Sequence, residues 1–438
     1  MDRKSPFQDE HREFDVVVYG ATGFTGELAA EHMCTYYLTR DGKYHGAKFA
    51  LAGRSMQKLE DVRDRLAKRL SKSLETVPLL VADISDPESL VSMCERTRVV
   101  ATTVGPYLTF GEPLVAACVN CSTHYCDITG ELPFVAKVFR EYGQRATERG
   151  LKIVHTCGWK CVATDLSCLL LEETFLKVAG CPCEEVKSAI TKIRGGLSGG
   201  TVASLVNLID HPSLRDRYYL CKNALPKHVP YKPPGESMSP PAKYMRFDKD
   251  FGYTGMEVGG SLDEAVVRWT SALLGNLYGK NFTYSVVRAL ENAGRLSTLF
   301  TSLILYVGLY AVRCKAVRSL LYALHVLPRP GEGPSRDTLE NGYYKMRTVG
   351  RTYLDKREDG SRRVLRTEVT FAGDDGDPGY RGAAKMLCEA ALCMAKQMNE
   401  CTGLCGVLSP AAGIGAVLKH RLQAKGVKIE VEVTEEGL

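Results

Sequence analysis

Apolar residues in the first 155 positions gather in short runs, and a more polar stretch that favours a helix lies between one run and the next. Residues 14–19 form the first run, FDVVVY, and residues 27–33 form the helical stretch behind it. Further runs lie at residues 48–53, 78–82, 98–104 and 151–155. Continuous apolar runs of this length are typical of strands that are buried on both faces. Their alternation with helices predicts an α/β protein with a doubly wound parallel sheet.

Three glycines at a spacing of three residues stand where the first predicted strand turns into the first helix. In a dinucleotide-binding turn, the first glycine permits the tight bend, the second lets the backbone approach a pyrophosphate, and the third lets helix and strand pack closely. The free N–H groups of the helix N-terminus favour the phosphates. We therefore predict a Rossmann domain over residues 14–160. The residues predicted to form its cofactor turn are Gly20, Thr22, Gly23, Phe24, Thr25 and Gly26.

The end of the second predicted strand bears on the choice between NAD and NADP. An NAD site usually places an acidic residue there to hold the ribose hydroxyls, whereas this chain has Arg54 and Ser55. A guanidinium and a hydroxyl suit the 2′-phosphate of NADP, so NADP is favoured and NAD is the alternative. For Arg54 the alternative is a solvated surface charge. Asp83, after the third strand, is expected either to accept from the adenine amino group or to cap the next helix.

Ligands of an open parallel sheet bind beyond the carboxyl ends of its strands. Thr103, Gly105 and Pro106 follow the fourth predicted strand, so we expect them on the nicotinamide side of the cofactor. Hydride transfer needs orientation and a proton source from the protein. The candidate catalytic residues, chosen by position alone, are Tyr107, His124 and Asp127. A histidine titrates near neutral pH, although a packed or capping side chain is the alternative for His124.

Four segments carry a family resemblance: "YGATGFTG", "LAGRSMQKL", "VGPYLTFGEPLVAACVNCSTHYCDITGE" and "LSPAAGIGAVLKHRL". Together they resemble the saccharopine dehydrogenase-like oxidoreductases, relatives of saccharopine reductase and of a bacterial trans-acting enoyl reductase, over about residues 14–433. The resemblance implies a nicotinamide-dependent oxidoreductase with a Rossmann domain and a second α+β domain. It further implies a lipid-like substrate and association with a membrane or lipid droplet, but it does not supply the substrate itself.

Residues 161–400 are expected to form the second domain, which serves substrate binding or dimerisation, and whether the chain is a homodimer stays open. A strand at residues 188–194 enters a glycine-rich turn at residues 195–201, which is either a flexible hairpin or a loop whose backbone closes over substrate. Residues 401–438 are expected to return to the Rossmann domain as a helix and a strand. Other segments predict loops at residues 226–241 and 251–260, a hairpin over residues 343–371 and a helix at residues 381–400.

Residues 296–312, LSTLFTSLILYVGLYAV, form an uncharged stretch that is flanked by Arg295 and Arg313. A helix of this length spans roughly 25 Å at about 1.5 Å per residue, somewhat less than the hydrocarbon core of about 30 Å. Another apolar stretch follows at residues 320–327. Three interpretations remain: a buried helix of the second domain, a membrane-surface or re-entrant hairpin, or a single membrane span.

Composition bears on the partners, the cellular compartment, the state of the cysteines and metal binding. The net charge of +6 over 438 residues is mild, and the basic residues are dispersed, so no nucleic-acid partner is expected. The polar start, residues 1–13, is expected to be an arm of a cytoplasmic protein rather than a secretory signal. The sixteen cysteines are therefore expected to be reduced, and no metal site is predicted.

The leading functional hypothesis is an NAD(P)-dependent reductase of a lipid-like enoyl, keto or imine substrate. A membrane-associated scaffold that retains the nucleotide fold is one alternative, because no clear acid–base pair stands out. A saccharopine-type amino-acid dehydrogenase is the other.

Overall fold

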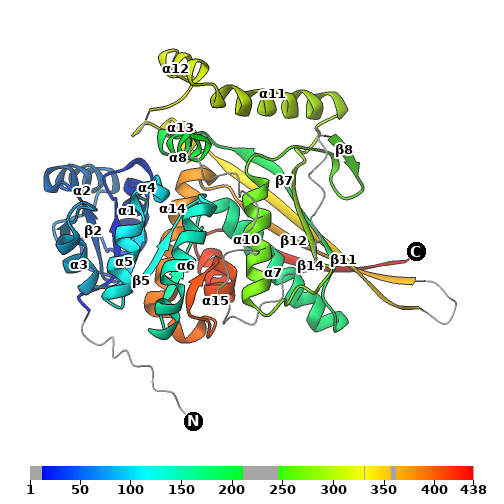
Figure 1. Cartoon of the computed structure of the whole chain (residues 1–438), viewed down its shortest axis with the longest axis horizontal. Coiled ribbons are helices and arrows are strands. Elements are labelled where there is room, and N and C mark those ends of the chain that lie inside the picture. The colour runs from blue at the N-terminus through cyan, green and yellow to red at the C-terminus, as the bar shows by residue number, and fades with distance from the viewer. Residues whose placement is uncertain (1–11, 211–244, 330, 357–361, 438) are drawn as a thin grey trace, which may run out of the picture.

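The computed structural model describes residues 12–210, 245–329, 331–356 and 362–437 (Figure 1). Two seven-stranded sheets organise this part of the chain, and one of them is parallel throughout. Most of the expected N-terminal arm and the expected loop at residues 226–241 lie outside the described residues.

The parallel sheet has the strand order of a doubly wound Rossmann fold, with β1 paired to β2 on one side and to β4 on the other. From edge to edge its strands are β13 (Gly406–Leu408), β6 (Lys152–Val154), β5 (His124–Asp127), β4 (Thr97–Thr102), β1 (Phe14–Tyr19), β2 (Phe49–Gly53) and β3 (Leu79–Val81). The predicted fold class is thereby confirmed, and the order of successive strands reverses between β1 and β4, where ligands of such sheets bind.

Both faces of this sheet are buried, which explains why its strands are apolar at successive positions. Val16 and Val18 belong to one core, whereas Val17 and Tyr19 belong to the other. The first core is closed by α1 (Phe24–Tyr37), α2 (Met56–Leu70) and α14 (Ala383–Lys396). The second core is closed by α3 (Pro87–Glu95), α5 (Glu112–Asn120) and α6 (Leu132–Glu148), with the short α4 (Tyr107–Phe110) before α5.

The sequence predicts only some of the elements that form and cover this sheet. Strand β5 was not predicted, because it is four residues long and carries histidine and aspartate at its ends. Strand β13, which the sequence does not predict, extends the sheet beyond β6. Helix α14 packs against β1, β4 and β5, although its residues had been assigned to the second domain.

The second sheet is mixed. From edge to edge its strands are β14 (Lys428–Gly437), β12 (Arg362–Gly373), β11 (Tyr343–Lys356), β7 (Glu185–Arg194), β10 (Thr283–Arg288), β9 (Gly252–Gly255) and β8 (Met245–Asp248). Helices α7 (Trp159–Ala179) and α10 (Gly260–Leu273) pack against it, and α15 (Pro410–Ala424) packs against α7.

Two expectations for this part are corrected. The last strand, β14, pairs antiparallel with β12 and not with the Rossmann sheet, so the end of the chain serves both sheets. The segment 251–260 is not a loop throughout, because Gly252–Gly255 forms β9 between β8 and β10. The expected hairpin over residues 343–371 is observed as β11 and β12.

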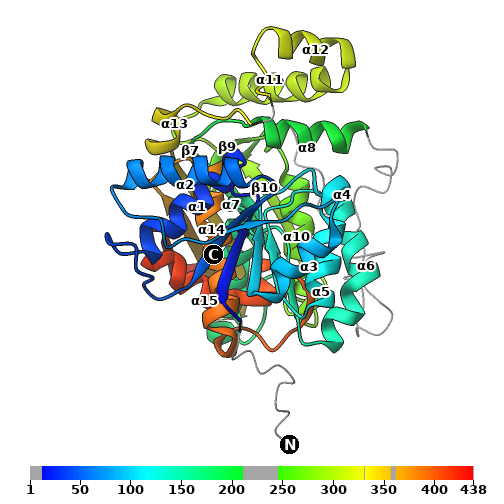
Figure 2. The same ribbon diagram turned by 90° about the vertical axis from the view of Figure 1, so that its left-hand side faces the viewer.

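Four helices lie together on one side of the molecule, away from those that cover the faces of the sheets. Helix α8 (Gly199–Asp210) and α13 (Arg336–Glu340) lie on the same side of the molecule as α11 (Arg295–Arg313) and α12 (Lys315–Ala323). Figures 1 and 2 show α11 and α12 as an outer layer beyond α8. Two short turns, η2 (Pro378–Gly382) and η3 (Met398–Glu400), flank α14.

Helix α11 is long and apolar enough to cross a membrane by length and composition. Only 17% of the most apolar 18-residue stretch of this helix is buried within the protein. The interpretation of this segment as a buried core helix is therefore wrong.

Candidate cofactor and substrate site

The glycine turn joins β1 to α1 at the carboxyl edge of the Rossmann sheet. Gly20 has a φ of +87°, a left-handed conformation that a side chain rarely adopts. A Cβ on Gly26 would lie 1.9 Å from the carbonyl oxygen of Gly20, so only glycine lets the helix pack this closely. Gly23 is exposed and caps α1 without a side-chain hydrogen bond, which leaves first-turn N–H groups available for an anion.

The other predicted residues of the turn surround these N–H groups. Thr22, Phe24 and Thr25 are each partly exposed at the start of α1. The residues present therefore fit a pyrophosphate: a bare backbone, two hydroxyls and a helix N-terminus meet at one place.

The carboxyl end of β2 carries the residues predicted for the 2′-phosphate. Arg54 is exposed, and Ser55 caps α2 by accepting from the backbone N–H of Lys58 at 3.4 Å. Both therefore lie at the edge where the adenosine of a dinucleotide would be held, with the guanidinium open to solvent. Their role in binding NADP stays a prediction.

Asp83 follows β3 at the same edge. It accepts hydrogen bonds from the backbone N–H and hydroxyl of Ser85, at 2.9 and 2.7 Å, and these bonds, with a smaller effect of Arg54, hold its pKa below the usual value. Helix α3 is capped by Asp86, so the helix-cap alternative for Asp83 is wrong. Its contact with adenine stays a prediction.

The segment after β4 lies directly beside the glycine turn. The backbone N–H of Thr103 donates to the carbonyl of Tyr19 at 3.1 Å, and its hydroxyl donates to the carbonyl of Gly20 at 3.4 Å. Gly105 and Pro106 continue from there into α4. The three residues that we expect near the nicotinamide are thus next to the turn that we expect to bind the pyrophosphate.

Tyr107, one of the candidate catalytic residues, is a buried side chain. Its hydroxyl donates to the carbonyl of Thr102 at 3.2 Å, and burial raises its pKa well above the usual value. Its proton is given to a backbone carbonyl of β4, not to a side chain of the candidate site, so its position does not favour a proton donor to substrate.

Asp127 is at the carboxyl end of β5, level with Tyr19 of β1 through β4. It is fully buried and lies 2.7 Å from His155 Nδ1, and it accepts from the backbone N–H groups of Thr129 and Thr156. These contacts shape the two loops that follow β5 and β6. The buried Asp127 carboxylate therefore holds these two loops in place and is a positioning residue for the candidate site.

His124 lies farther from this edge than the other candidates. It pairs with Val99 and so lies level with Val16, roughly 10 Å before the strand ends at about 3.3 Å per residue. Its Nδ1 accepts from the backbone N–H of Lys152, and burial, aided by nearby Lys152 and Arg12, lowers its pKa to about 4. The structure places His124 among packed residues, away from the cofactor turn.

The glycine-rich loop at residues 195–201 and helix α8 lie across the carboxyl edge of the Rossmann sheet (Figure 2). Thr201 Oγ1 and the hydroxyl of Tyr380 share a hydrogen bond of 2.9 Å, and the backbone N–H of Ser198 donates to the same tyrosine oxygen. The ring of Tyr380 meets that of Phe24 edge-on at 5.4 Å. The bonded hydroxyls of Tyr380 and Thr201 therefore belong to a group that contacts Phe24, the first residue of α1.

One helical turn farther along α8, the Ser204 hydroxyl donates to Glu131 Oε1 at 3.0 Å. The same carboxylate accepts from the backbone N–H groups of Tyr107 and Leu108, both at 2.9 Å. Glu131 is fully buried, and its hydrogen bonds join α8 to the first turn of α4.

Of this second group, the sequence indicated only Ser198 and Thr201, through their glycine-rich turn. Glu131, Ser204 and Tyr380 were missed, because their contacts join segments that are far apart in the chain. Asp377 helps to place Tyr380: it caps η2 and also accepts from the backbone N–H of Gly196, which brings the two segments together.

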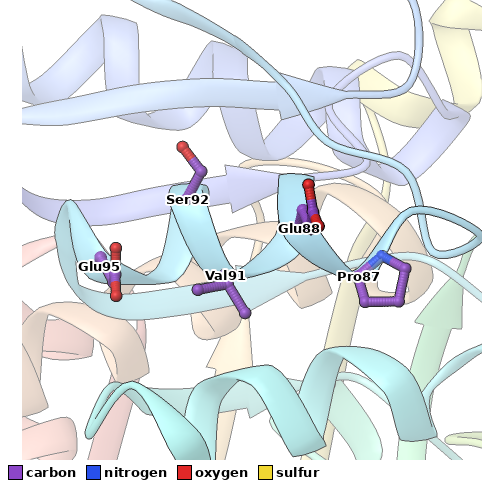
Figure 3. Close-up of a pocket in the computed structure, with 5 residues that line it drawn as sticks. All are labelled: Pro87, Glu88, Val91, Ser92 and Glu95. Carbon is purple, nitrogen blue, oxygen red and sulfur yellow. The ribbon is translucent and has the colours of Figure 1, made fainter.

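A separate hollow of about 330 Å³ lies on α3, lined by Pro87, Glu88, Val91, Ser92 and Glu95 (Figure 3). Its two carboxylates would repel phosphates, and we assign it no part in cofactor binding. Among the described residues, no three histidine, cysteine, aspartate or glutamate side chains are grouped to hold a metal ion.

Comparison with known proteins agrees with this geometry. The saccharopine dehydrogenase NADP binding domain matches residues 16–154. A putative trans-acting enoyl reductase of Mycobacterium tuberculosis is 35% identical over 96% of this chain and 97% of its own, and a trans-acting enoyl reductase of Mycobacterium ulcerans is 33% identical over 95% and 97%.

Among solved structures, apo saccharopine dehydrogenase (L-Glu forming) of Saccharomyces cerevisiae has a TM-score of 0.53 and 12% identity, and the match covers 96% of this chain and 99% of that one. At this identity the likeness shows the fold. The relatives that match over nearly the whole length show the family and the class of enzyme. The chain belongs to the saccharopine dehydrogenase-like family of NAD(P)-dependent oxidoreductases, with an NADP-binding domain at its amino end.

Proposed function

We propose that this protein is an NADPH-dependent reductase that transfers hydride to a lipid-like substrate with an enoyl, keto or imine group, at the cytoplasmic surface of a membrane or lipid droplet. One observation carries the proposal. Helix α8 and Tyr380 hold a row of hydroxyls across the edge where the glycine turn and the loop after β4 meet. A bound nicotinamide and a substrate would lie between these two layers.

The chain's own residues supply binding and orientation. The glycine turn holds the pyrophosphate, Arg54 and Ser55 hold the 2′-phosphate, and Thr103, Gly105 and Pro106 border the nicotinamide. Bound NADPH supplies the hydride.

The proton source that we propose is the hydroxyl of Tyr380. Its oxygen already accepts from the backbone N–H of Ser198, so its own proton points to Thr201 Oγ1 or to a substrate oxygen or nitrogen. Hydrogen bonds at this position stabilise the charge that develops on the substrate as hydride arrives. The names of the two mycobacterial relatives support an enoyl group as the first substrate class to try.

The test is oxidation of NADPH, followed by absorbance, with a panel of enoyl, keto and imine compounds that do or do not carry long acyl chains. We expect turnover with an acyl-chain member of the panel and a loss of kcat on the order of 100-fold in Tyr380→Phe, with NADPH affinity unchanged. Val178→Glu, on the outer surface of α7, is the matched control and should behave as wild type.

If NADPH binds but no compound oxidises it, the reductase proposal is wrong and the scaffold alternative gains. Turnover confined to saccharopine-type imines would favour the amino-acid dehydrogenase alternative.

A further inference from the structure

Helix α11 is mounted with its apolar side outward. The side chains that face solvent recur every three or four residues and form one stripe along the helix: Leu296, Leu299, Phe300, Leu303, Ile304, Val307 and Tyr310. Leu296 is 80% exposed, and Leu303 and Val307 are each 56% exposed. Helix α12 and the turn after it add Leu320, Leu324 and Val326 to the same outer layer.

The opposite side of α11 is the more polar one, and it contacts the body. Thr298 and Ser302 are buried, and the backbone N–H of Met256 donates to the hydroxyl of Ser302 at 3.3 Å. A Cβ on Gly255 of β9 would lie 2.4 Å from that hydroxyl, so the helix is seated closely. A helix that serves a protein core turns its apolar side inward, and α11 does the reverse.

Residues 295–329 contain five cationic side chains and no aspartate or glutamate: Arg295, Arg313, Lys315, Arg318 and Arg329. Two of them, Arg313 and Lys315, lie where α11 meets α12, and the Arg313 guanidinium stacks on the Tyr310 ring at 4.8 Å. An apolar stripe with cations at its ends and tyrosines beside it matches the boundary between acyl chains and anionic headgroups.

We propose that α11 and α12 form a docking surface for a phospholipid layer with anionic headgroups. The stripe on α11 enters the acyl-chain boundary, and the cations at the helix ends bind headgroup phosphates. This inference names the part of the chain that makes the surface contact in the proposed function.

The contacts of α11 with the body distinguish a surface helix from a membrane span. Thr298 near its start and Val312 near its end are both buried on the same side, so the helix is held against the body along most of its length. A span would require the helix to leave these contacts, whereas an interfacial helix buried about 5–10 Å keeps them.

Helix α8 connects this surface to the candidate site. Arg318 of α12 is largely buried and pairs with Asp210 at the end of α8 at 2.8 Å. On the same helix, Ser204 binds Glu131 and Thr201 binds Tyr380. The docking surface and the hydroxyl row thus share one helix, so a docked enzyme would hold its substrate side toward the lipid.

The test is flotation of the full-length protein with vesicles of phosphatidylcholine, with or without phosphatidylserine. We expect the wild type to float with the anionic vesicles and less with the neutral ones. The double variant Leu303→Glu, Val307→Glu should lower partitioning by on the order of 100-fold. Val178→Glu is the control for added charge: that valine is 55% exposed on α7, so the change puts one of the two added negative charges on another part of the surface.

Failure of the wild type to float, or equal flotation of the double variant, would overturn the proposal. A wild type that stays off vesicles but forms a dimer that the double variant dissociates, measured by light scattering, would overturn it in favour of a second copy. Flotation needs neither NADPH nor substrate, and the double variant should keep the NADPH affinity of the wild type. A failed reductase assay therefore leaves this test intact.

Discussion

Replacing Gly26 with alanine tests the glycine turn directly. The added Cβ would lie 1.9 Å from the carbonyl oxygen and 2.7 Å from the carbonyl carbon of Gly20, both of which are backbone atoms. No rotamer change relieves this contact, so α1 must move away from β1. A displacement of about 1.5 Å is needed to reach an ordinary contact distance.

Two effects follow from that displacement. Overpacking of a close helix–strand contact typically costs about 1–3 kcal/mol of unfolding free energy. The first-turn N–H groups also leave the position that suits a pyrophosphate, and losing one charge-assisted hydrogen bond of about 1.5–3 kcal/mol weakens binding by roughly 10–100-fold. We therefore expect Gly26→Ala to lower both stability and NADPH affinity.

Thermal unfolding and calorimetric titration with NADPH separate the two effects. Gly23→Ala is the informative partner, because its Cβ would come no closer than 3.4 Å to a neighbour and yet would stand on the exposed surface of the turn. It should keep wild-type stability and lose NADPH affinity. Gly308→Ala, in open space in the middle of α11, should leave NADPH affinity unchanged and raise stability by up to about 1 kcal/mol. If Gly26→Ala melts and binds NADPH as wild type does, the close contact and the cofactor turn are both refuted.

Three further predictions address single side chains. Arg54→Ala should raise the Kd for NADPH by roughly 10–100-fold and leave that for NADH nearly unchanged, and equal losses for both coenzymes would contradict a 2′-phosphate contact. Glu131→Gln leaves one of two backbone N–H groups without its acceptor and loosens Ser204, so KM for substrate should rise while NADPH affinity, measured by titration, is kept. Burial raises the pKa of Asp165 to about 7, so the folded state binds a proton that the unfolded state releases near pH 4. As pH rises from 4 to 7, this group should therefore lower the unfolding free energy by about 1.4 kcal/mol per pH unit. Asp165→Asn, compared with wild type by denaturant titration at each pH, should lack that part of the slope.

The parts of the site that the sequence predicted are those encoded over a short distance. The glycine turn is a local pattern, because three glycines at a spacing of three residues suffice to shape the bend. Arg54 was predicted in the same way, from its place directly after a predicted strand. Both predictions depend only on the order of neighbouring residues.

The missed parts depend on contacts between distant segments. Glu131 binds Ser204 across 73 positions, and Tyr380 meets Thr201 across 179. No local pattern marks a glutamate or tyrosine for such a role. The same limit applies to α14, whose apolar sequence predicts a core helix but not the sheet that it covers.

Helix α11 shows a further limit of hydropathy. Its sequence is compatible with a buried core helix, a membrane span or a membrane-surface helix. The mean hydropathy of the helix does not depend on which side each residue faces. The direction becomes clear from two polar residues: Thr298 and Ser302 occupy the side that packs on β9, and Leu296, Leu299 and Leu303 are exposed. In a soluble helix, the same two hydroxyls would mark the solvent side. The position of these hydroxyls therefore argues for lipid contact more strongly than the length of the apolar stretch does.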